Sequence, residues 1–330
     1  MISEYITYGL IFFILVFLEI LYFKIAERFN ITDKPNERSS HDIIVLRGGG
    51  IIFLLSIWLW SAFFGFLYPW FLLGLTIVCG VSLLDDIHSL PDSVRLLAQF
   101  VAMLLLFADL QILNWSGWWI TILALIICVG IVNAYNFMDG INGITVGYSL
   151  AVLIPLIILN TSIHFIEVSY LITAMIACLV FSYYNFRPKG KAKCFAGDVG
   201  SIGIAFIIVL PLGKLILQTG DFTYILLLSM YGVDSILTIC HRIILHENLG
   251  KAHRKHAFQI MANELKMPHE LVSLFYMITQ IIVSLGLIYI DNYHIAYFFV
   301  VLCILCIAYI LFMKKFYHLH SEYLKATKIK

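Results

Sequence analysis

Residues 118–143 read WWITILALIICVGIVNAYNFMDGING, and they join two contrasting compositions in one stretch. Residues 118–132 contain no charged residue, and a helix of roughly 15–20 such residues crosses a bilayer. Residues 133–143 hold three Asn, one Asp and two Gly, whereas a helix end needs only one Gly or Asn. The stretch therefore predicts a membrane-spanning helix whose end carries a surplus of hydrogen-bonding groups.

The whole chain shares this apolar character. Of its 330 residues, 62% are hydrophobic and 12% are charged, whereas soluble domains are nearer half apolar and a quarter charged. A soluble core could not bury this much apolar side chain, and the alternating ten-residue strands of a membrane barrel are absent. The first apolar run lacks a basic start and a small-residue cleavage site, so we expect a membrane helix there and not a signal peptide. The expected fold class is an all-α polytopic membrane protein.

Eleven apolar runs predict about eleven transmembrane helices in a single domain of residues 1–330. The expected spans are 6–23, 48–67, 70–84, 94–108, 117–133, 144–160, 165–184, 201–217, 222–240, 271–290 and 295–313. The long basic connections are 24–47, 85–95, 185–200, 241–270 and the tail from 314, and they hold 20 of the 21 Lys and Arg residues. Positive charge collects on the cytoplasmic side, so we expect the N-terminus outside and the C-terminus in the cytoplasm.

The unusual polar stretches gather on that cytoplasmic side. Asp85 and Asp86 are adjacent at a helix end, where two carboxylates need a cation or a shared proton. They suit a magnesium site or a general base, or else they form an ordinary acidic cap. Asp198 lies between two glycines at a helix start, a position that suits either a metal ligand beside a phosphate or a plain N-cap.

The stretch 133–143 has a spacing of its own. Asn133, Asn136 and Asp139 are three residues apart, and they share one face if the helix continues through Asn136. Amides with one carboxylate suit a pyrophosphate or sugar hydroxyls, and Gly140 allows close backbone approach. The alternative is a hydrogen-bonded helix terminus.

Two further stretches carry charge. His253, Arg254 and His256 suit phosphate oxygens and uracil-type recognition, and the lack of nearby Cys argues against zinc. Asp234 lies within an expected span, where a carboxylate is a functional candidate, and we expect it to pair with Arg242 two turns along.

A third stretch precedes the second span. In residues 32–51, Gly48–Gly50 open the span, and the basic and hydroxyl residues before them could form a phosphate or nucleotide lip or else a solvated basic loop.

Six motifs, taken together and in order, resemble the polyprenyl-phosphate N-acetylhexosamine-1-phosphate transferases of glycosyltransferase family 4. They cover roughly residues 33–259 and are PNERSSH…RGGG (35–50), LLDD…LP…VRLLAQ (83–99), NAYNFMDGING (133–143), GDVGS (197–201), VDSILTICHR (233–242) and HRKHAFQ (253–259). The expected helix number and topology also agree with this family.

The resemblance implies an enzyme that moves a sugar 1-phosphate from a UDP-N-acetylhexosamine to undecaprenyl phosphate and releases UMP. It implies Mg²⁺, with Mn²⁺ as the alternative, and a place in the bacterial cytoplasmic membrane with the active site facing the cytoplasm. It implies no nucleic-acid partner, and it leaves the oligomeric state open between monomer and homodimer.

The resemblance also assigns roles to residues. Asp198 is the implied metal ligand, and Asp85, Asp86 and Asp139 are the implied catalytic carboxylates. The implied substrate-binding residues are Asn133, Asn136, His253, Arg254, His256 and Arg47.

Two departures from the family pattern matter. The last loop has His-Arg-Lys-His where the peptidoglycan branch has three consecutive His, which argues against a muramoyl-pentapeptide donor. Ile44, Val45 and Leu46 replace a Pro-Thr-Pro turn before Arg47. UDP-GlcNAc is the expected donor, with a 6-deoxy sugar such as UDP-QuiNAc or UDP-FucNAc second, and the downstream polymer is not specified.

Two rival functions predict different features. An intramembrane prenyltransferase would need two facing Asp-rich clusters, and an ion-coupled transporter would place its carboxylates at mid-membrane.

Overall fold

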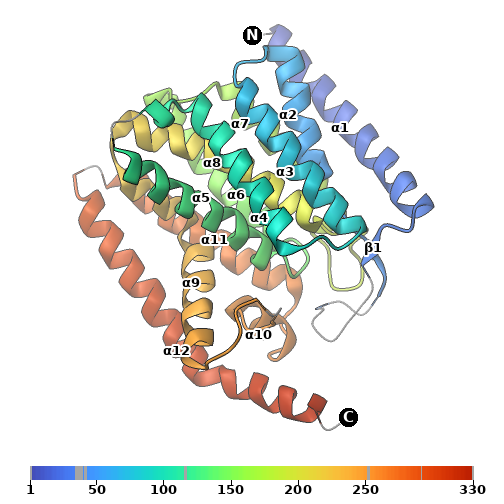
Figure 1. Cartoon of the computed structure of the whole chain (residues 1–330), viewed down its shortest axis with the longest axis vertical. Coiled ribbons are helices and arrows are strands. Elements are labelled where there is room, and N and C mark those ends of the chain that lie inside the picture. Colours follow the sequence, from blue (N-terminus) through green and yellow to red (C-terminus); the bar gives the residue numbers. More distant parts are fainter. Residues whose placement is uncertain are drawn as a thin grey trace.

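The computed structural model describes residues 2–33, 40, 43–114, 117–250, 253–290 and 292–328. The helices of this part of the chain form one bundle, with the two termini at opposite ends of its long axis (Figure 1). The helices are α1 (Ile2–Arg28), α2 (Ile51–Phe64), α3 (Pro69–Ile87), α4 (Asp92–Asp109), α5 (Trp118–Met138), α6 (Ile144–Ile163), α7 (Val168–Asn185), α8 (Gly197–Thr219), α9 (Ser229–Ile244), α10 (Ala257–Asn263), α11 (His269–Tyr289) and α12 (His294–Lys328). Two 3-10 segments, Ile112–Asn114 and Phe222–Leu228, lie before α5 and α9.

The expected membrane architecture is confirmed. Nine helical segments of the described residues are long and apolar enough to cross a bilayer. The other two expected spans coincide with α2, which has only 14 residues, and with α4, which carries charged residues at both ends. Each of the eleven apolar runs is therefore a helix, and the chain is an all-α polytopic membrane protein.

Several helix ends differ from the prediction, among them those of α5, α8 and α12. Helix α5 continues to Met138 because its Asn side chains bond to neighbouring helices, so polarity does not end it. Helix α8 begins at Gly197, and α12 runs to Lys328, well beyond the expected end at 313. The extra length of α12 packs against α10 and gives its far end a protein partner.

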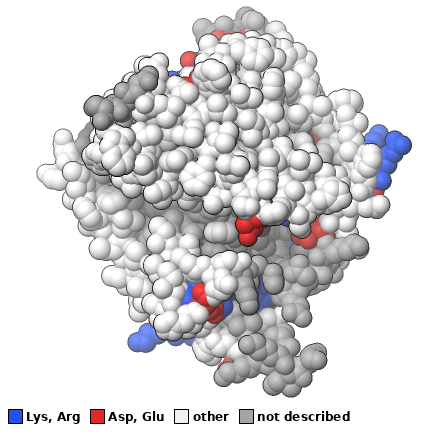
Figure 2. Space-filling view, viewed as in Figure 1, with Lys and Arg blue, Asp and Glu red and all other residues white. Residues whose placement is uncertain are grey.

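Helix α8 lies at the centre of the bundle and packs against α2, α3, α5 and α6. Helices α1 and α12 lie at the outside (Figure 1), and they expose large apolar side chains such as Phe13, Phe299 and Ile304. The face in Figure 2 is largely uncharged above, and charged side chains gather in its lower half around a hollow. Exposed apolar area of this extent fits a lipid-facing surface.

A glycine contact joins the start of α2 to the start of α8. Strand β1 (Thr32–Asp33) pairs with β2 (Val45–Leu46), and the chain after β2 runs beside residues 194–196. The backbone N–H groups of Gly49 and Gly50 donate to the carbonyls of Phe195 and Ala196. A Cβ on Gly50 would meet the Cα of Gly200 at 2.2 Å. The two helix starts can approach this closely only because both residues lack a side chain.

We predict that Gly200→Ala destabilises the protein, because its new Cβ would lie 2.6 Å from the Cα of Gly50. Backbone atoms cannot move aside as a flexible side chain can, so the free energy of unfolding should fall by at least about 1–3 kcal/mol. Thermal unfolding in detergent, followed by intrinsic fluorescence, measures the effect. Gly80→Ala is the matched control, because a Cβ there meets nothing within 4 Å. Equal melting temperatures for the two variants would contradict the prediction.

Candidate active site

The site begins where the end of α3 meets the start of α8. Asp86 is buried in the last turn of α3, and its two carboxylate oxygens accept hydrogen bonds from the backbone N–H groups of Asp198 at 2.9 Å and Val199 at 3.1 Å. The first N–H groups of a helix have no partner within the helix, and its N-terminus favours a negative charge. Asp86 thus caps α8 from another helix and places Asp198 beside itself.

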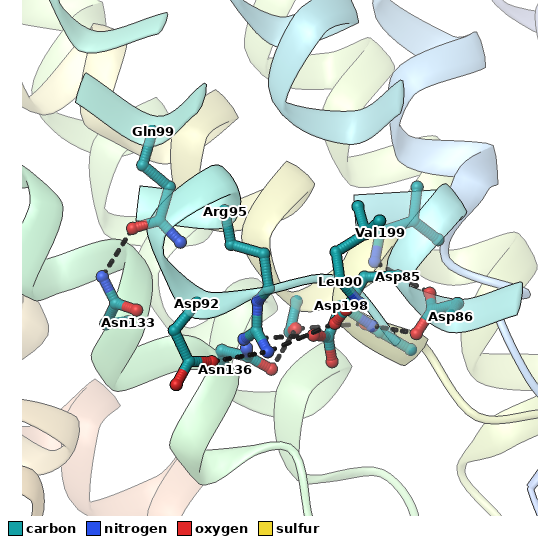
Figure 3. Close-up of polar contacts among 12 residues, drawn as sticks. Asp85, Asp86, Leu90, Asp92, Arg95, Gln99, Asn133, Asn136, Asp198 and Val199 are labelled. Atoms are coloured by element: carbon teal, nitrogen blue, oxygen red, sulfur yellow. Dashed lines mark hydrogen bonds and ion pairs between the residues drawn. The ribbon is translucent and has the colours of Figure 1, made fainter. Parts of the chain in front are cut away.

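Two arginines link the three aspartates of this meeting point. Arg47 contacts Asp86 Oδ1 through Nε at 2.7 Å and Asp198 Oδ1 through Nη2 at 3.3 Å. Arg95 contacts Asp85 Oδ2 through Nη1 at 3.2 Å and Asp198 Oδ2 through Nη2 at 3.3 Å (Figure 3). Asp198 therefore lies between two guanidinium groups, each of which retains a quarter to a third of its side-chain exposure. We call Arg47, Asp85, Asp86, Arg95 and Asp198 the Asp–Arg cluster.

Arg95 was missed as a site residue in the sequence. It lies in the first turn of α4, within the quoted motif 94–99, and Asp85 also accepts the backbone N–H of Leu90 at 2.6 Å across the same turn. The pattern that could have identified Arg95 is a cation one short loop away from the adjacent carboxylates of Asp85 and Asp86. Arg47, which the family resemblance implies as a substrate-binding residue, also lies in this cluster.

The polar side chains of 133–143 bond to different helices. Asn133 donates to Gln99 Oε1 at 2.7 Å, and Asn136 accepts from the hydroxyl of Ser201 at 3.2 Å (Figure 3). Helix α5 ends at Met138, and Asp139 accepts from the hydroxyl of Thr145 at 2.6 Å. The helix does continue through Asn136 as considered, but the three side chains bond to three different helices and form no single row. Asn136, through Ser201 on α8, is the one that these contacts place beside the Asp–Arg cluster.

The second predicted cluster lies between α9, α10 and α12. The ring of His256 lies 5.0 Å from that of His253 and 6.4 Å from that of Phe137, so this loop meets the end of α5. Arg254 pairs with Glu264 at 3.0 Å and lies 4.4 Å from the ring centroid of Tyr323. Its guanidinium thus holds the end of α12, while the two histidines lie nearer the stretch 133–143.

The expected pairing of Asp234 with Arg242 is wrong. Asp234 contacts His256 Nδ1 at 3.2 Å, whereas Arg242 pairs with Glu247 and donates to the carbonyls of Asn248 and Leu249. Spacing along one helix does not reveal that the loop after α9 folds back against it. Most of the PNERSSH motif (35–41) lies outside the described residues, but Ser40 accepts a 3.0 Å hydrogen bond from Asn263 of α10.

The atoms of the Asp–Arg cluster that could ligate a metal are the carboxylate oxygens of its aspartates, and oxygen ligands suit Mg²⁺ or Mn²⁺. Within the described ranges, no group of three or more His, Cys, Asp or Glu residues could hold a metal by itself. Magnesium needs no such cage, because it is commonly held by one or two carboxylates together with substrate phosphates. The residues therefore fit a metal that is completed by an anionic substrate.

Comparison with known proteins gives matches that include the aspartates and Arg95 of the Asp–Arg cluster. A family model described as glycosyl transferase family 4 matches residues 68–212. A probable undecaprenyl-phosphate N-acetylglucosaminyl 1-phosphate transferase of Bacillus subtilis is 27% identical over 71% of this chain and 70% of its own length. The undecaprenyl-phosphate alpha-N-acetylglucosaminyl 1-phosphate transferase of Thermotoga maritima is 26% identical over 73% and 76%. A phospho-N-acetylmuramoyl-pentapeptide-transferase of Moorella thermoacetica is 32% identical over only 34% and 36%.

The electrostatics of Asp139 yield a prediction about pH. Burial raises the pKa of its carboxyl to about 7. The folded protein therefore keeps a proton there that the unfolded chain loses near pH 4, so the free energy of unfolding falls as pH rises from about 4 to about 7. We predict that Asp139→Asn, whose amide oxygen still accepts from Thr145, raises the melting temperature at about pH 8 and has a smaller effect at about pH 5.

Thermal unfolding at the two pH values, with EDTA present, measures the difference between variant and parent. Asp92→Asn is the matched control, because the Asp92 side chain is 89% exposed. A shift for Asp139→Asn that is equal at both pH values would contradict the assignment.

Proposed function

The chain belongs to glycosyl transferase family 4, and from this premise we propose that it transfers GlcNAc-1-phosphate from UDP-GlcNAc to undecaprenyl phosphate. The chain is a phospho-sugar transferase, and the reaction releases UMP and leaves a lipid-linked pyrophosphoryl sugar that starts a cell-envelope glycan. The names of the Bacillus and Thermotoga relatives support the acceptor and the sugar phosphate. The observation that carries the proposal is a charged cluster at helix ends, linked to an apolar groove by the hydrogen bond between Asn133 and Gln99.

The apolar groove lies between α5, α9 and α12. Its volume is about 450 Å³, and Asn133 and Phe137 line its polar end. A second apolar groove of about 270 Å³ lies farther toward the start of α5, and Ile127 and Ile131 line both. A polyprenyl chain needs such a lining, because its isoprene units would otherwise face water or displace lipid. The pairing of Asn133 with Gln99 connects this lining to α4, which carries Arg95.

The chemistry follows from the charges of the cluster. Phosphoryl transfer depends mainly on positioning and on neutralising the charge of the phosphate oxygens. Arg47 and Arg95 would exchange part of their contact with Asp198 for those oxygens, since both guanidinium groups remain partly exposed. Asp198 would hold Mg²⁺, which supplies charge neutralisation at the pyrophosphate.

The roles of the other carboxylates follow from their contacts. Asp86 keeps the start of α8 in place, and Asp85 orients Arg95. A phosphate monoester is already largely ionised near neutral pH, so the acceptor does not require a general base.

The orientation in the membrane is part of the proposal. The long loops hold 20 of the 21 Lys and Arg residues, and the Asp–Arg cluster lies at the ends of α3 and α8 that join these loops. The positive-inside rule supports a site at the cytoplasmic face of a bacterial inner membrane. A panel of UDP-GlcNAc, UDP-QuiNAc and UDP-FucNAc distinguishes the donors.

We predict Mg²⁺-dependent UMP release when the purified protein is mixed with UDP-GlcNAc and undecaprenyl phosphate. Asp198→Ala and Asp86→Ala should abolish it, and the Asp86 variant should also melt at a lower temperature because α8 loses its cap. Glu27→Gln is the control, since Glu27 forms an exposed pair with Lys193. Full activity of both Asp variants would refute the site assignment, and no UMP from any donor of the panel would refute the function.

The groove gives a second prediction. Gly232 lines it, and a Cβ there meets nothing within 4 Å, so Gly232→Leu should fill the groove without strain. Loss of about two buried methylene contacts, at roughly 0.8 kcal/mol each, corresponds to about a tenfold higher KM for undecaprenyl phosphate. The kcat should stay unchanged, as should the KM for UDP-GlcNAc.

Initial rates against undecaprenyl phosphate and the shorter farnesyl phosphate measure the effect. Gly80→Leu is the matched control, because Gly80 also has open space around its Cβ and lies outside the residues that line this groove. An unchanged KM for the long acceptor would place the prenyl chain elsewhere.

A further inference from the structure

Asp234 is a buried carboxylate to which the proposed reaction assigns no role. It lies on α9 and is 3% exposed, yet its two oxygens receive four hydrogen bonds. The donors are the Thr238 hydroxyl at 3.1 Å, the His256 ring at 3.2 Å, the Ala257 N–H at 3.1 Å and the Tyr276 hydroxyl at 2.6 Å. These groups come from α9, from the loop that ends at His256, and from α10 and α11. The carboxylate thus joins the histidine loop to the membrane helices.

The hydrogen bonds determine how His256 is oriented. An ionised carboxylate only accepts, so the contact of His256 Nδ1 with Asp234 needs a proton on that nitrogen. The His256 side chain also makes a capping contact with the backbone N–H of Gln259 in the first turn of α10. The other nitrogen, Nε2, is buried and has no partner among the described residues. A buried polar nitrogen without a partner is costly unless a ligand completes it. His256 is therefore held by one nitrogen and presents the other.

The surroundings of His256 place its ring beside the end of α5, which lines the proposed prenyl groove. Phe137 of α5 lies 6.4 Å away ring to ring, and Phe258, next to His256, lies 3.0 Å from where a Cβ of Gly140 would be. The charged or titratable neighbours of His253 include His256, Arg242, Lys255 and Glu247. Burial lowers the pKa of His253 to about 3, so His253 is uncharged near neutral pH.

We propose that Asp234 is a positioning residue that holds His256 so that its Nε2 binds an anionic phosphate oxygen of the nucleotide-sugar donor. This inference rests on the proposed function, because the donor supplies the diphosphate. The negative charge of Asp234 is the countercharge for a doubly protonated ring, the form in which an Nε2–H can donate to an anionic oxygen. Thr238 also contacts the hydroxyl of Tyr309 on α12 at 2.8 Å, so three membrane helices fix the position of this pair.

Asp234→Asn tests the role of the charge. The amide keeps the size of the carboxylate and can still accept from Thr238 and Ala257, so the fold should survive. We expect kcat/KM for UDP-GlcNAc to fall roughly 10–100-fold, as is usual when the orienting partner of a functional histidine is lost. His256→Gln should cause a similar loss, and the double variant should lose no more than either alone, because the two residues act as one unit.

Asp221→Asn is the matched control. Asp221 forms a second Asp–His pair, with His294 at 2.5 Å, between the 3-10 segment 222–228 and α12. We expect its kcat/KM to match the parent. If Asp234 only caps α10, the losses from Asp234→Asn and His256→Gln will add in the double variant, and this outcome overturns the proposal.

Nitrogen-15 spectra of histidine-labelled protein in nanodiscs give a readout that does not depend on turnover. The signal that is missing from His256→Gln should show the Nδ1–H tautomer, and UDP should shift its Nε2 resonance. In Asp234→Asn this UDP-induced shift should be lost. An Nε2–H tautomer in the parent, or no response to UDP, overturns the proposal. Failure of the parent to release UMP would instead refute the proposed function, and the tautomer would still report on the Asp234–His256 pair.

Discussion

The contact on which the rest of the site depends joins the carboxylate of Asp86 to the backbone N–H groups of Asp198 and Val199, the second and third residues of α8. An apolar helix of 23 residues that begins inside a bundle needs partners for its initial N–H groups, because water cannot reach them cheaply. A carboxylate supplies both acceptors and the negative charge that this helix end favours. Gly197 is required there, since a Cβ would lie 2.5 Å from the Asp86 carboxylate and its φ is +72°.

That contact also brings carboxylates close together, and the two arginines offset their repulsion. Three aspartates at one bundle end would repel one another in a medium of low dielectric constant. Arg47 and Arg95 approach Asp198 from opposite sides, one from the loop before α2 and one from α4. Two cations among three anions leave one negative charge, which suits a divalent ion, while the partly exposed guanidinium groups suit phosphate oxygens. The same arrangement thus stabilises the fold and prepares it for an anionic substrate.

Two further helices, α5 and α12, shape the surroundings of the cluster. Two apolar grooves follow α5 at different heights, and the helix ends near the charged cluster through the Asn136–Ser201 contact, so a lipid chain and its phosphate would lie at different depths along one helix. The far part of α12 lies outside the expected span and holds the histidine loop through Glu264, which receives Arg254 and His320. The two carboxylates that pair with residues of this loop, Asp234 of α9 and Glu264 at the end of α10, are almost fully buried. Buried pairs of this kind impose one geometry on a loop that would otherwise be mobile.

The sequence alone determined the class of the protein, because composition decides whether a chain can bury its apolar side chains in water. It also predicted the eleven helices and the aspartates of the cluster, since apolar length and carboxylates at helix ends are local features. Tertiary structure alone decided which polar groups meet. Arg95 and Arg47 converge on Asp198 from positions 103 and 151 residues away, Asn133 turns to Gln99, and Asp234 meets His256 in place of Arg242. The physical reason is that a buried charge must be paired, and the partner is whichever group the packing of distant helices brings within reach.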